Sequence, residues 1–441
     1  MATTDGTTPL TTRLLHLFQH LGFPRAHIAG RVTEDWSGLV QANPETVGSL
    51  TLVCPGGLEA EAVQPVAARL CVISGDTGAP GSAVRQAMAS LAQASLVTLR
   101  DYFGHTRADL LTDRRQEIGT AMLAFLDRMQ QAAPLAPLRL PQTQGEVQEV
   151  SYQVQGEGPP LVLLPLGLAA SQWQPLLGQL SAHYCTIVLG GAVMGSVASL
   201  ERRGHSAGYL GVVRTMIEHL QPQPGETILD VGCGSGVLDR WLARYTGGVN
   251  RIVATDIHLT LLREAAALAA REGLSQLIEF REGNAEAMPF PDQSFEVTMS
   301  ATVMELLDAD AMLREMIRVT RPGGRVGIVV RAVDMHSLVN LPLRPALRAK
   351  VEALPNGLAG PRGCADSSLY RRFCEAGLRE VKMSPQLATY SGAQTHGMQE
   401  RVHAALSPEE LDEWQQAVRS AAAAGTFFIA LPFHCAVGTR A

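Results

Sequence analysis

The chain lacks any CxxC pair and any visible cluster of metal ligands. Its 441 residues include seven cysteines, scattered at positions 54, 71, 185, 233, 364, 374 and 435. An odd, dispersed set does not suit a disulfide framework and favours reduced thiols in a cytoplasmic protein. We therefore expect small buried core cysteines and no metal site.

Long apolar runs and basic runs are also missing. The apolar stretch 159–170 falls well short of the roughly 18 residues that suggest a membrane span. The first residues, MATTDGTTPLTTR, lack the basic and then apolar layout of a signal peptide. The formal net charge is −6, and no basic run is present to follow a nucleic-acid backbone. We expect no membrane span and no nucleic-acid partner, while these patterns say nothing about the oligomeric state.

The most informative stretch is ETILDVGCGSG, at positions 226–236. It predicts a buried strand, a glycine-rich turn and a helix that opens at Val237. The alternating Gly232, Gly234 and Gly236 permit a sharp turn and let a ligand lie against bare main chain. The helix beyond the turn offers unpaired N–H groups and a partial positive charge. This arrangement is typical of a nucleotide-type cofactor site.

The next hundred residues support such a site. A second strand is predicted at 251–257 with Asp256 at its tip, 26 residues after Asp230, where a carboxylate can bind both hydroxyls of a ribose. A third strand and its loop are predicted at 278–290, with Asn284 and Ala285 at the strand's end, and a fourth strand and its loop at 294–307. The turn RPGGR at 321–325 precedes a fifth strand.

The ordered motifs DVGCGSG, Asp256, GNAEAMPFPDQSFEV and RPGGR resemble class I S-adenosylmethionine-dependent methyltransferases, of the type that modifies quinones and similar small molecules. The resemblance spans about 130 residues and implies a Rossmann-like α/β sheet, S-adenosyl-L-methionine as cofactor and a small-molecule methyl acceptor. Many relatives have Asp in place of Asn284, and Glu-His in place of Glu305-Leu306. The residues that it implies for cofactor binding are Asp230, Gly232, Cys233, Gly234, Gly236, Asp256, Ile257, Asn284, Ala285, Ser300 and Tyr209.

Two other functions compete with a methyltransferase at this site. A dinucleotide oxidoreductase is disfavoured because the turn reads GxGxG rather than GxGxxG and no second nucleotide-binding half is evident. A scaffold that binds S-adenosylmethionine without turnover is the other alternative, and the sequence does not decide against it.

If the acceptor is a hydroxyl, a general base would help the transfer. The candidates are His205, Glu305 and His434, although His434 also fits a packing role on the final strand.

The first 130 residues alternate strands and helices, which predicts an α/β unit with a mainly parallel sheet. Their order resembles the second half of an α/β-hydrolase. Val32, in GRVTE, stands where that family has its nucleophilic serine, Asp76 fits the acid position poorly, and His105 matches the catalytic histidine. A base without a nucleophile performs no acyl transfer. We expect a non-catalytic relic, and a bifunctional methyltransferase and hydrolase is the alternative.

Residues 131–145 are predicted to be a linker, and 146–195 resemble the first half of the same fold, with one strand at 146–156 and Pro165 at the oxyanion-loop position. The halves are therefore in swapped order, and we hypothesise one permuted sheet over residues 10–190. The literal GxSxG match at 204–208 follows a charged, helix-like lead-in rather than a strand, so it is not expected to be a nucleophile elbow.

The methyltransferase domain is predicted at 205–441, with a substrate-covering insertion at about 336–376. Its end carries clear signals. Ser407, followed by Pro408 and Glu410, predicts a capped helix at 408–423. A final strand at 426–440 is predicted to close a terminal antiparallel pair.

Overall fold

The computed structural model describes residues 9–31, 34–104, 109–191, 194–357 and 359–441. The chain divides into two compact units, one ending at Ser199 and the other beginning at Leu200. The division lies within helix α8 (Gly195–Gly204), between the predicted boundaries at 195 and 205. In the described part of the chain, no helix is long and apolar enough to cross a membrane.

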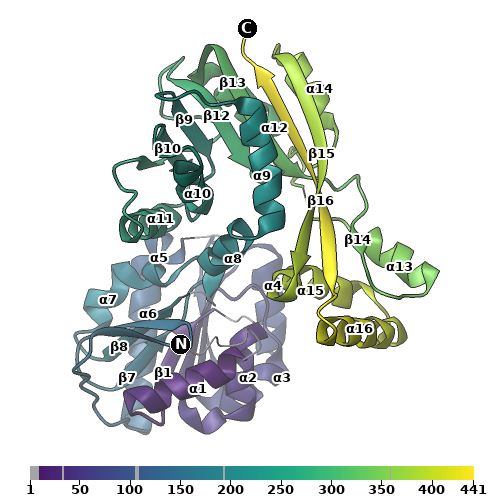
Figure 1. Cartoon of the computed structure of the whole chain (residues 1–441). Helices are drawn as coiled ribbons and strands as arrows, with labels where there is room; N and C mark the ends of the chain where they lie inside the picture. The colour runs from purple at the N-terminus through teal and green to yellow at the C-terminus, as the bar shows by residue number, and fades with distance from the viewer. Residues whose placement is uncertain (1–8, 32–33, 105–108, 192–193, 358) are drawn as a thin grey trace. The chain divides into compact units, whose positions relative to one another are not determined.

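Unit 1 is an eight-stranded sheet with helices on its faces (Figure 1). Its strands are β1 (Ala26–Gly30), β2 (Val47–Val53), β3 (Leu70–Gly75), β4 (Ser95–Leu99), β5 (Gln144–Val147), β6 (Val150–Gln155), β7 (Pro160–Leu163) and β8 (Cys185–Gly190). Its helices are α1 (Leu10–Leu21), α2 (Glu34–Ala42), α3 (Ala60–Val63), α4 (Gly78–Met88), α5 (Leu110–Asp113), α6 (Arg115–Ala132) and α7 (Gln174–Leu180).

The strand order is β4-β3-β2-β1-β7-β8-β6-β5. Strands β1–β4 precede the predicted linker and β6–β8 follow it, while β5 begins within the last two residues of that range, so each segment supplies one contiguous half of a single sheet. The halves meet where β1 pairs in parallel with β7, with Ile28 opposite Val162. The pairs β5–β6 and β6–β8 are antiparallel, and the other pairs of this sheet are parallel.

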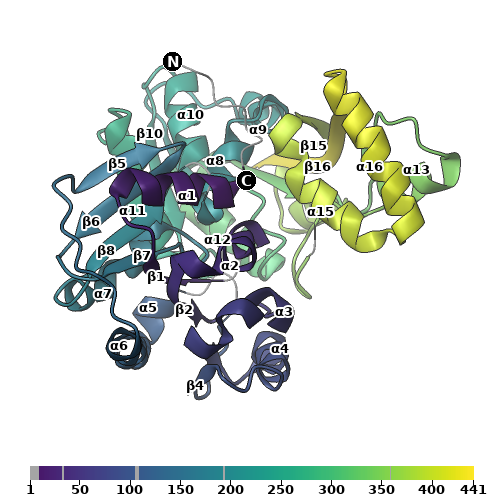
Figure 2. The ribbon, with the colours of Figure 1, turned by 90° about the horizontal axis from the view of Figure 1, so that it is seen from below.

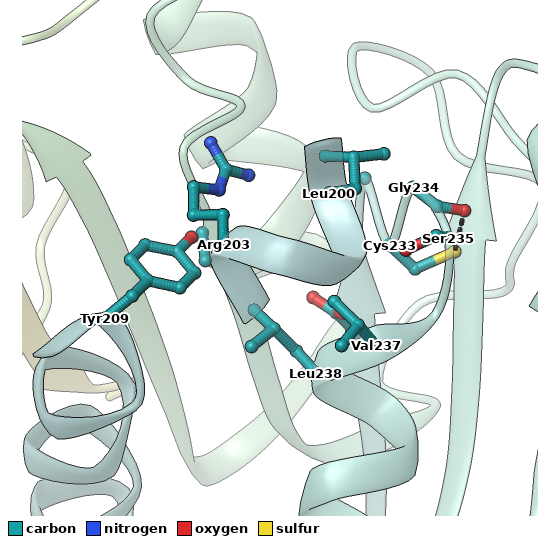
Figure 3. Close-up of a pocket in the computed structure, with 11 residues that line it drawn as sticks. Leu200, Arg203, Tyr209, Cys233, Gly234, Ser235, Val237 and Leu238 are labelled. Atoms are coloured by element: carbon teal, nitrogen blue, oxygen red, sulfur yellow. Dashed lines mark hydrogen bonds between the residues drawn. The ribbon is translucent and has the colours of Figure 1, made fainter. Parts of the chain in front are cut away.

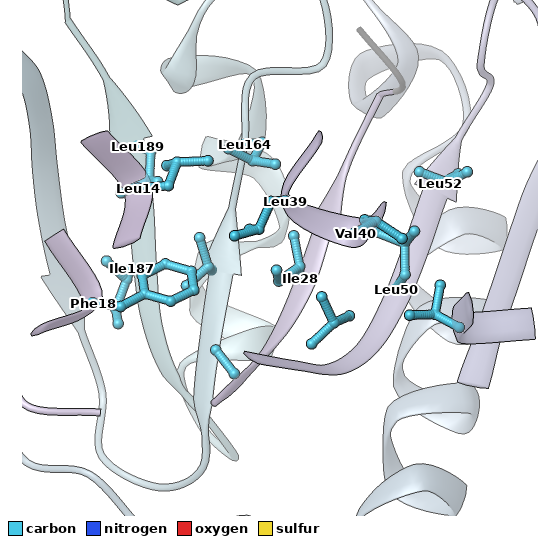
Figure 4. Packing of buried hydrophobic residues seen from close by; sticks show 14 of the residues in the cluster. Leu14, Phe18, Ile28, Leu39, Val40, Leu50, Leu52, Leu164, Ile187 and Leu189 are labelled. Atoms are coloured by element: carbon cyan, nitrogen blue, oxygen red, sulfur yellow. The ribbon is translucent and has the colours of Figure 1, made fainter. Parts of the chain in front are cut away.

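Apolar side chains fill both faces of this sheet. Figure 4 shows Leu14 and Phe18 of α1 against Ile187 and Leu189 of β8. The apolar face of α1 is formed by Leu14, Leu17, Phe18 and Leu21, which are all buried. Burying a large apolar side chain contributes about 1.5–3 kcal/mol, so these faces supply the main stabilisation of the sheet.

The single strand predicted at 146–156 is wrong. The structure has a hairpin of β5 and β6 that turns at Gln148 and Glu149, both with positive φ (48° and 66°). Neither residue is the glycine or asparagine that normally signals such a turn. A residue outside the hairpin stabilises the turn instead. Arg13 of α1 donates to the Gln148 carbonyl at 2.6 Å and to the Glu149 carboxylate at 2.5 Å.

Of the hydrolase-like positions, Val32 and His105 lie outside the described residues. Arg31, which precedes Val32, is among the described residues and is 4 % exposed. Its guanidinium donates to the carbonyls of Cys54, Gly104 and Leu166, which follow three different strands. Burial lowers the pKa of Arg31. This cation occupies the carboxyl ends of the strands, where an open α/β sheet usually binds its ligand.

Unit 2 contains the second sheet, with order β11-β10-β9-β12-β13-β16-β14 and β15 paired to β16. Its strands are β9 (Thr227–Val231), β10 (Arg251–Asp256), β11 (Ile278–Glu282), β12 (Phe295–Ala301), β13 (Thr320–Arg331), β14 (Leu338–Val339), β15 (Arg379–Ser391) and β16 (Phe428–Thr439). Its helices are α9 (Ala207–Leu220), α10 (Val237–Tyr245), α11 (Leu259–Arg271), α12 (Ala309–Val319), α13 (Pro345–Glu352), α14 (Ser368–Glu375), α15 (His396–Ala405) and α16 (Pro408–Ala423).

The strands β9 to β13 are parallel, so their carboxyl ends meet at one edge. The predicted terminal antiparallel pair is confirmed, and Figure 1 shows β15 and β16 as long neighbouring strands. The predicted capping box is also confirmed, because Ser407 accepts from the Glu410 amide and Glu410 accepts from the Ser407 amide. Figure 2 shows α13, α15 and α16 gathered at the far end of this pair, around buried Trp414.

Candidate active site

The site is built on a backbone bend at the end of β9. The amides of Gly232 and Cys233 both donate to the carbonyl of Thr255, at 2.7 and 3.0 Å, so the bend is attached to the end of β10. Gly232, Gly234 and Gly236 have φ values of +80°, +59° and +71°. Residues with a side chain rarely adopt such positive φ angles, which explains why glycine occupies these three alternating positions.

Asp256 ends β10, the strand directly beside β9. Its Oδ2 accepts from the Gly234 amide at 2.9 Å and its Oδ1 accepts from the His258 amide at 3.0 Å. The residue is 8 % exposed. These two bonds hold an acidic group at the rim of the bend, in the position that the sequence predicts for a ribose-binding carboxylate.

A pocket opens beside the bend (Figure 3). The free space within it, counted together with the open solvent at its mouth, is about 360 Å³. It is lined by Leu200, Arg203, Tyr209, Asp230, Gly232, Cys233, Gly234, Ser235, Val237, Leu238 and Ala301. Five of the residues predicted for cofactor binding therefore share one pocket, and Asp256 is bonded to its floor.

The end of helix α8 covers this pocket. In Figure 3, Leu200 lies over the turn and Arg203 lies beside Tyr209. The helix is held down by Glu201, whose carboxylate pairs with the buried Arg240 of α10 at 2.5 Å. A side chain at Gly204 would place its Cβ 2.3 Å from Val237, so the approach of the two helices requires glycine.

The serine of the GxSxG match is a helix cap, as its helical lead-in predicts. Ser206 precedes α9, and its hydroxyl accepts from the Tyr209 amide at 3.3 Å. The residues before it form α8 rather than a strand. This cap fixes the start of the helix that carries Tyr209, whose hydroxyl lies 3.4 Å from that of Thr302.

Two buried carboxyl groups lie under the bend, Asp230 of β9 and Asp239 of α10. Burial and the neighbouring Asp239 raise the pKa of Asp230 well above its usual range. Burial raises the pKa of Asp239 to about 7, although its hydrogen bond with Asp230 and nearby Arg240 oppose the rise. The pair therefore retains at least one proton near neutral pH. Burial also raises the pKa of the Cys233 thiol, so this cysteine is not an activated nucleophile.

The other residues predicted for cofactor binding lie elsewhere. Gly236 starts α10 and packs closely against Phe280 and Ala265, with no part in lining the pocket. The Ser300 hydroxyl donates to the Val231 carbonyl at 2.6 Å. Asn284 and Ala285 follow β11, the first exposed and the second buried in the core, and Ile257 is 58 % exposed.

The three predicted bases have different surroundings. His205 is exposed, and its Nδ1 donates to the Glu201 carbonyl at 2.8 Å. Glu305 is fully buried and accepts from the Arg331 amide at 2.6 Å. His434 is 3 % exposed, its Nε2 lies 2.7 Å from Asp334 Oδ1, and its Nδ1 has no partner among the described residues. His434 thus combines an orienting carboxylate, that of Asp334, with a second ring nitrogen that has no partner among the described residues.

Several residues of the site give little signal in the sequence. Leu200 and Arg203 lie in a charged helical segment, and Ala301 is an ordinary strand residue. Arg331 ends the fifth strand of unit 2 and Asp334 follows it, and neither residue belongs to a recognised motif.

The predicted insertion is linked to the loop after β12, where the amides of Gly360 and Cys364 donate to the carbonyls of Glu305 and Met304.

Raised carboxyl pKa values predict a pH-dependent stability for the ligand-free chain. A raised folded-state pKa contributes stability that is present below the unfolded pKa and is lost as the pH rises through the folded pKa. For Asp239 the window runs from about pH 4 to about pH 7. We expect Asp239→Asn to make the melting temperature less dependent on pH across this window, measured by thermal melts. The exposed Asp412→Asn is the control, and equal pH profiles for wild type and Asp239→Asn would refute the assignment.

The bend has the features that S-adenosylmethionine requires. Bare backbone is present at Gly232 and Gly234, the Asp256 carboxylate lies at the rim of the bend, and the Ser235 hydroxyl is buried without a partner among the described residues. In the described part of the chain, no group of three or more His, Cys, Asp or Glu residues could hold a metal ion.

Comparison with known proteins places the same segment in a family. A family described as "Methyltransferase domain" matches residues 228–324. The chain is 32 % identical over 187 residues to the ubiquinone/menaquinone biosynthesis C-methyltransferase UbiE of Hahella chejuensis, covering 40 % of this chain and 68 % of that protein. It is 36 % identical over 167 residues to UbiE of Escherichia coli, covering 37 % and 62 % of the two chains.

Other relatives are matched over less of their length, such as UbiE of Legionella pneumophila, of which the chain spans 47 % at 34 % identity. Among solved structures, a putative methyltransferase from Bacillus halodurans is 16 % identical, with a TM-score of 0.35 over 52 % of this chain and 99 % of that one. The chain belongs to the class I S-adenosylmethionine-dependent methyltransferases, the family of these UbiE proteins, and S-adenosyl-L-methionine is its cofactor.

Proposed function

We propose that the chain transfers the cofactor's methyl group to a carbon atom of a small aromatic molecule of the quinol type. The observation that carries this proposal is the match to the Hahella protein, whose printed name is that of a C-methyltransferase and which the chain spans for 68 % of its length.

In this proposal the cofactor supplies a methyl group already activated on a sulfonium, so the protein mainly orients the reactants and excludes water. Asp256 would bind the ribose hydroxyls, and the main chain at Gly232 and Gly234 would lie against the ligand. Leu200 and Tyr209 would cover the reacting atoms. The insertion at 336–376 would help to enclose the acceptor, which its bonds to the loop after β12 support.

A carbon acceptor must lose a proton during the reaction, and His434 is the proposed base. Its backbone lies opposite Val330, at the carboxyl end of β13 and so at the edge where the site opens. If Nε2–H donates to Asp334, the lone pair of Nδ1 is free to accept a proton. His205 is less suited because its side chain is 65 % exposed and so is not shielded from water, and Glu305 because its carboxylate is bonded to the Arg331 amide.

The test is turnover of S-adenosylmethionine by the full chain with reduced naphthoquinones and benzoquinones, both unsubstituted and carboxylated, with mass spectrometry of the products. We expect a product with one new methyl group on carbon, heavier by one CH2 because the carbon loses a proton. His434→Asn should lower kcat roughly a hundredfold, in the range of general-base contributions, and leave the affinity for S-adenosylhomocysteine unchanged. His219→Asn, at a histidine bonded to Ser384, is the matched control. A full kcat in His434→Asn would exclude the base, and cofactor binding without turnover of any acceptor would favour a scaffold.

We also propose that unit 1 is a permuted, hydrolase-like domain without acyl-transfer activity. The proposed limits of the domains are those predicted from the sequence. The contiguous halves of its sheet support the permutation. Arg31, bonded to three strand ends, supports the loss of activity. Six of the seven cysteines are buried and all are free, which supports a cytoplasmic location.

A further inference from the structure

Two guanidinium groups interact electrostatically in unit 2, that of Arg203, which lines the proposed methyl-transfer pocket, and that of Arg331. Arg203 lines the pocket from α8, and its guanidinium carbon is 4.9 Å from the centre of the Tyr209 ring (Figure 3). Arg331 ends β13 and lies within electrostatic range of Arg203, Tyr209 and Tyr390. The two cations come from elements far apart in sequence and share one end of the sheet.

Their positive charge is only partly neutralised. The carboxylate facing Arg331 belongs to Glu305, whose Oε1 accepts from the Arg331 amide, while its Oε2 lies 3.5 Å from the guanidinium. The side chain of Arg331 is 27 % exposed. Burial and the neighbouring Arg203 lower the pKa of Arg331. The Nε of Arg203 is buried and has no hydrogen-bond partner among the described residues.

This arrangement is costly unless a ligand completes it. A buried donor without a partner is destabilising because its lost hydration is not replaced, and two nearby cations repel each other. The sulfonium of the cofactor adds a third positive charge beside them. An anion bound between the guanidinium groups would remove all three penalties, and the planar fork of arginine matches carboxylate and phosphate oxygens.

We propose that Arg203 and Arg331 bind an oxyanion of the methyl acceptor, which is therefore a quinol-type aromatic molecule that also carries a carboxylate or phosphate group near the methylated carbon. This inference rests on the proposed function. The rest of the acceptor would meet aromatic walls, because Tyr209 and Tyr390 are both buried and close to the cations. Glu305 limits the affinity of this site for the anion, because its carboxylate competes with the ligand for Arg331.

The experiment uses the full chain saturated with S-adenosylhomocysteine and three probes: benzoate, phenyl phosphate and the neutral benzamide. Calorimetry should show that at least one of the anions binds roughly ten times more tightly than benzamide. Loss of one charged hydrogen bond corresponds to roughly ten- to hundredfold weaker binding, so Arg331→Gln and Arg203→Gln should lose that preference. Arg202→Gln, at an exposed arginine on the same helix, should keep it.

Two further variants keep the proposal testable if Arg331→Gln is unstable. Arg331→Lys should retain a weaker preference for the anions, because the charge remains without the fork. Glu305→Gln should bind the anions several times more tightly than wild type, since the competing charge is gone while an amide oxygen can still accept from the Arg331 amide. Equal binding of anions and benzamide by the S-adenosylhomocysteine complex would overturn this proposal alone, whereas failure to bind S-adenosylhomocysteine would overturn the proposed function with it.

Discussion

Asp256→Ala is expected to weaken the binding of S-adenosylhomocysteine at least about a hundredfold. Hydrogen bonds to a charged group contribute roughly 1.5–3 kcal/mol each, and a ribose offers two hydroxyls to this carboxylate. The substitution also leaves the amides of Gly234 and His258 without their acceptor, so the bend loses one of its attachments. Calorimetric titration of wild type and variant with S-adenosylhomocysteine measures the effect directly.

The matched control is Glu282→Ala on the next strand. Glu282 is opposite Asp256 in the pairing of β10 and β11, and its side chain is exposed. Removing it changes the net charge equally without touching the bend. We expect unchanged affinity in this variant. Equal losses in the two variants would mean that general electrostatics, rather than a ribose contact, determines binding.

Gly232→Ala is expected to destabilise unit 2 by roughly 2–5 kcal/mol and to abolish cofactor binding. The residue has φ of +80°, which costs an L-residue about 1–2 kcal/mol. Its new Cβ would also lie 2.3 Å from Cγ2 of Val303. A β-branched neighbour cannot swing away freely, and overpacking typically costs about 1–3 kcal/mol more. Urea denaturation of the full chain gives the stability, and titration gives the affinity.

Gly225→Ala separates the cost of a positive φ from the cost of overpacking. Gly225 precedes β9 with a similar φ of +87°, but a Cβ there would meet nothing within 4 Å. We expect this variant to lose only the conformational part, about 1–2 kcal/mol, and to bind the cofactor normally. If both alanine variants were equally stable and active, close packing at the bend would have no part in the site.

The cofactor half of the site was predictable because local chemistry determines it. A sharp turn at a strand's end requires glycine, and the alternation of Gly232, Gly234 and Gly236 shows this directly in the sequence. Asp256 follows from the spacing of two strands. The capping box at Ser407 is equally local. Each of these features depends on a few neighbouring residues, so the pattern and the structure agree.

The features that sequence reasoning missed depend on distant partners. The turn at Gln148 and Glu149 has no turn residues and depends on Arg13, about 135 positions away. Arg203 looked like one charge on a solvated helix, yet the pairing of Glu201 with Arg240 holds that helix over the pocket. Gly236 fitted the glycine pattern but serves to pack α10 against Phe280 and Ala265. Tertiary contacts of this kind leave no periodic signal.

The most direct test of the central claim is a calorimetric titration of the purified full chain with S-adenosylhomocysteine, and in parallel with NADH. The bend at Gly232 and the carboxylate of Asp256 predict one site for S-adenosylhomocysteine with a micromolar Kd, and no heat of binding with NADH. No binding of S-adenosylhomocysteine, or binding of NADH at equal strength, would contradict a methyltransferase site at this bend.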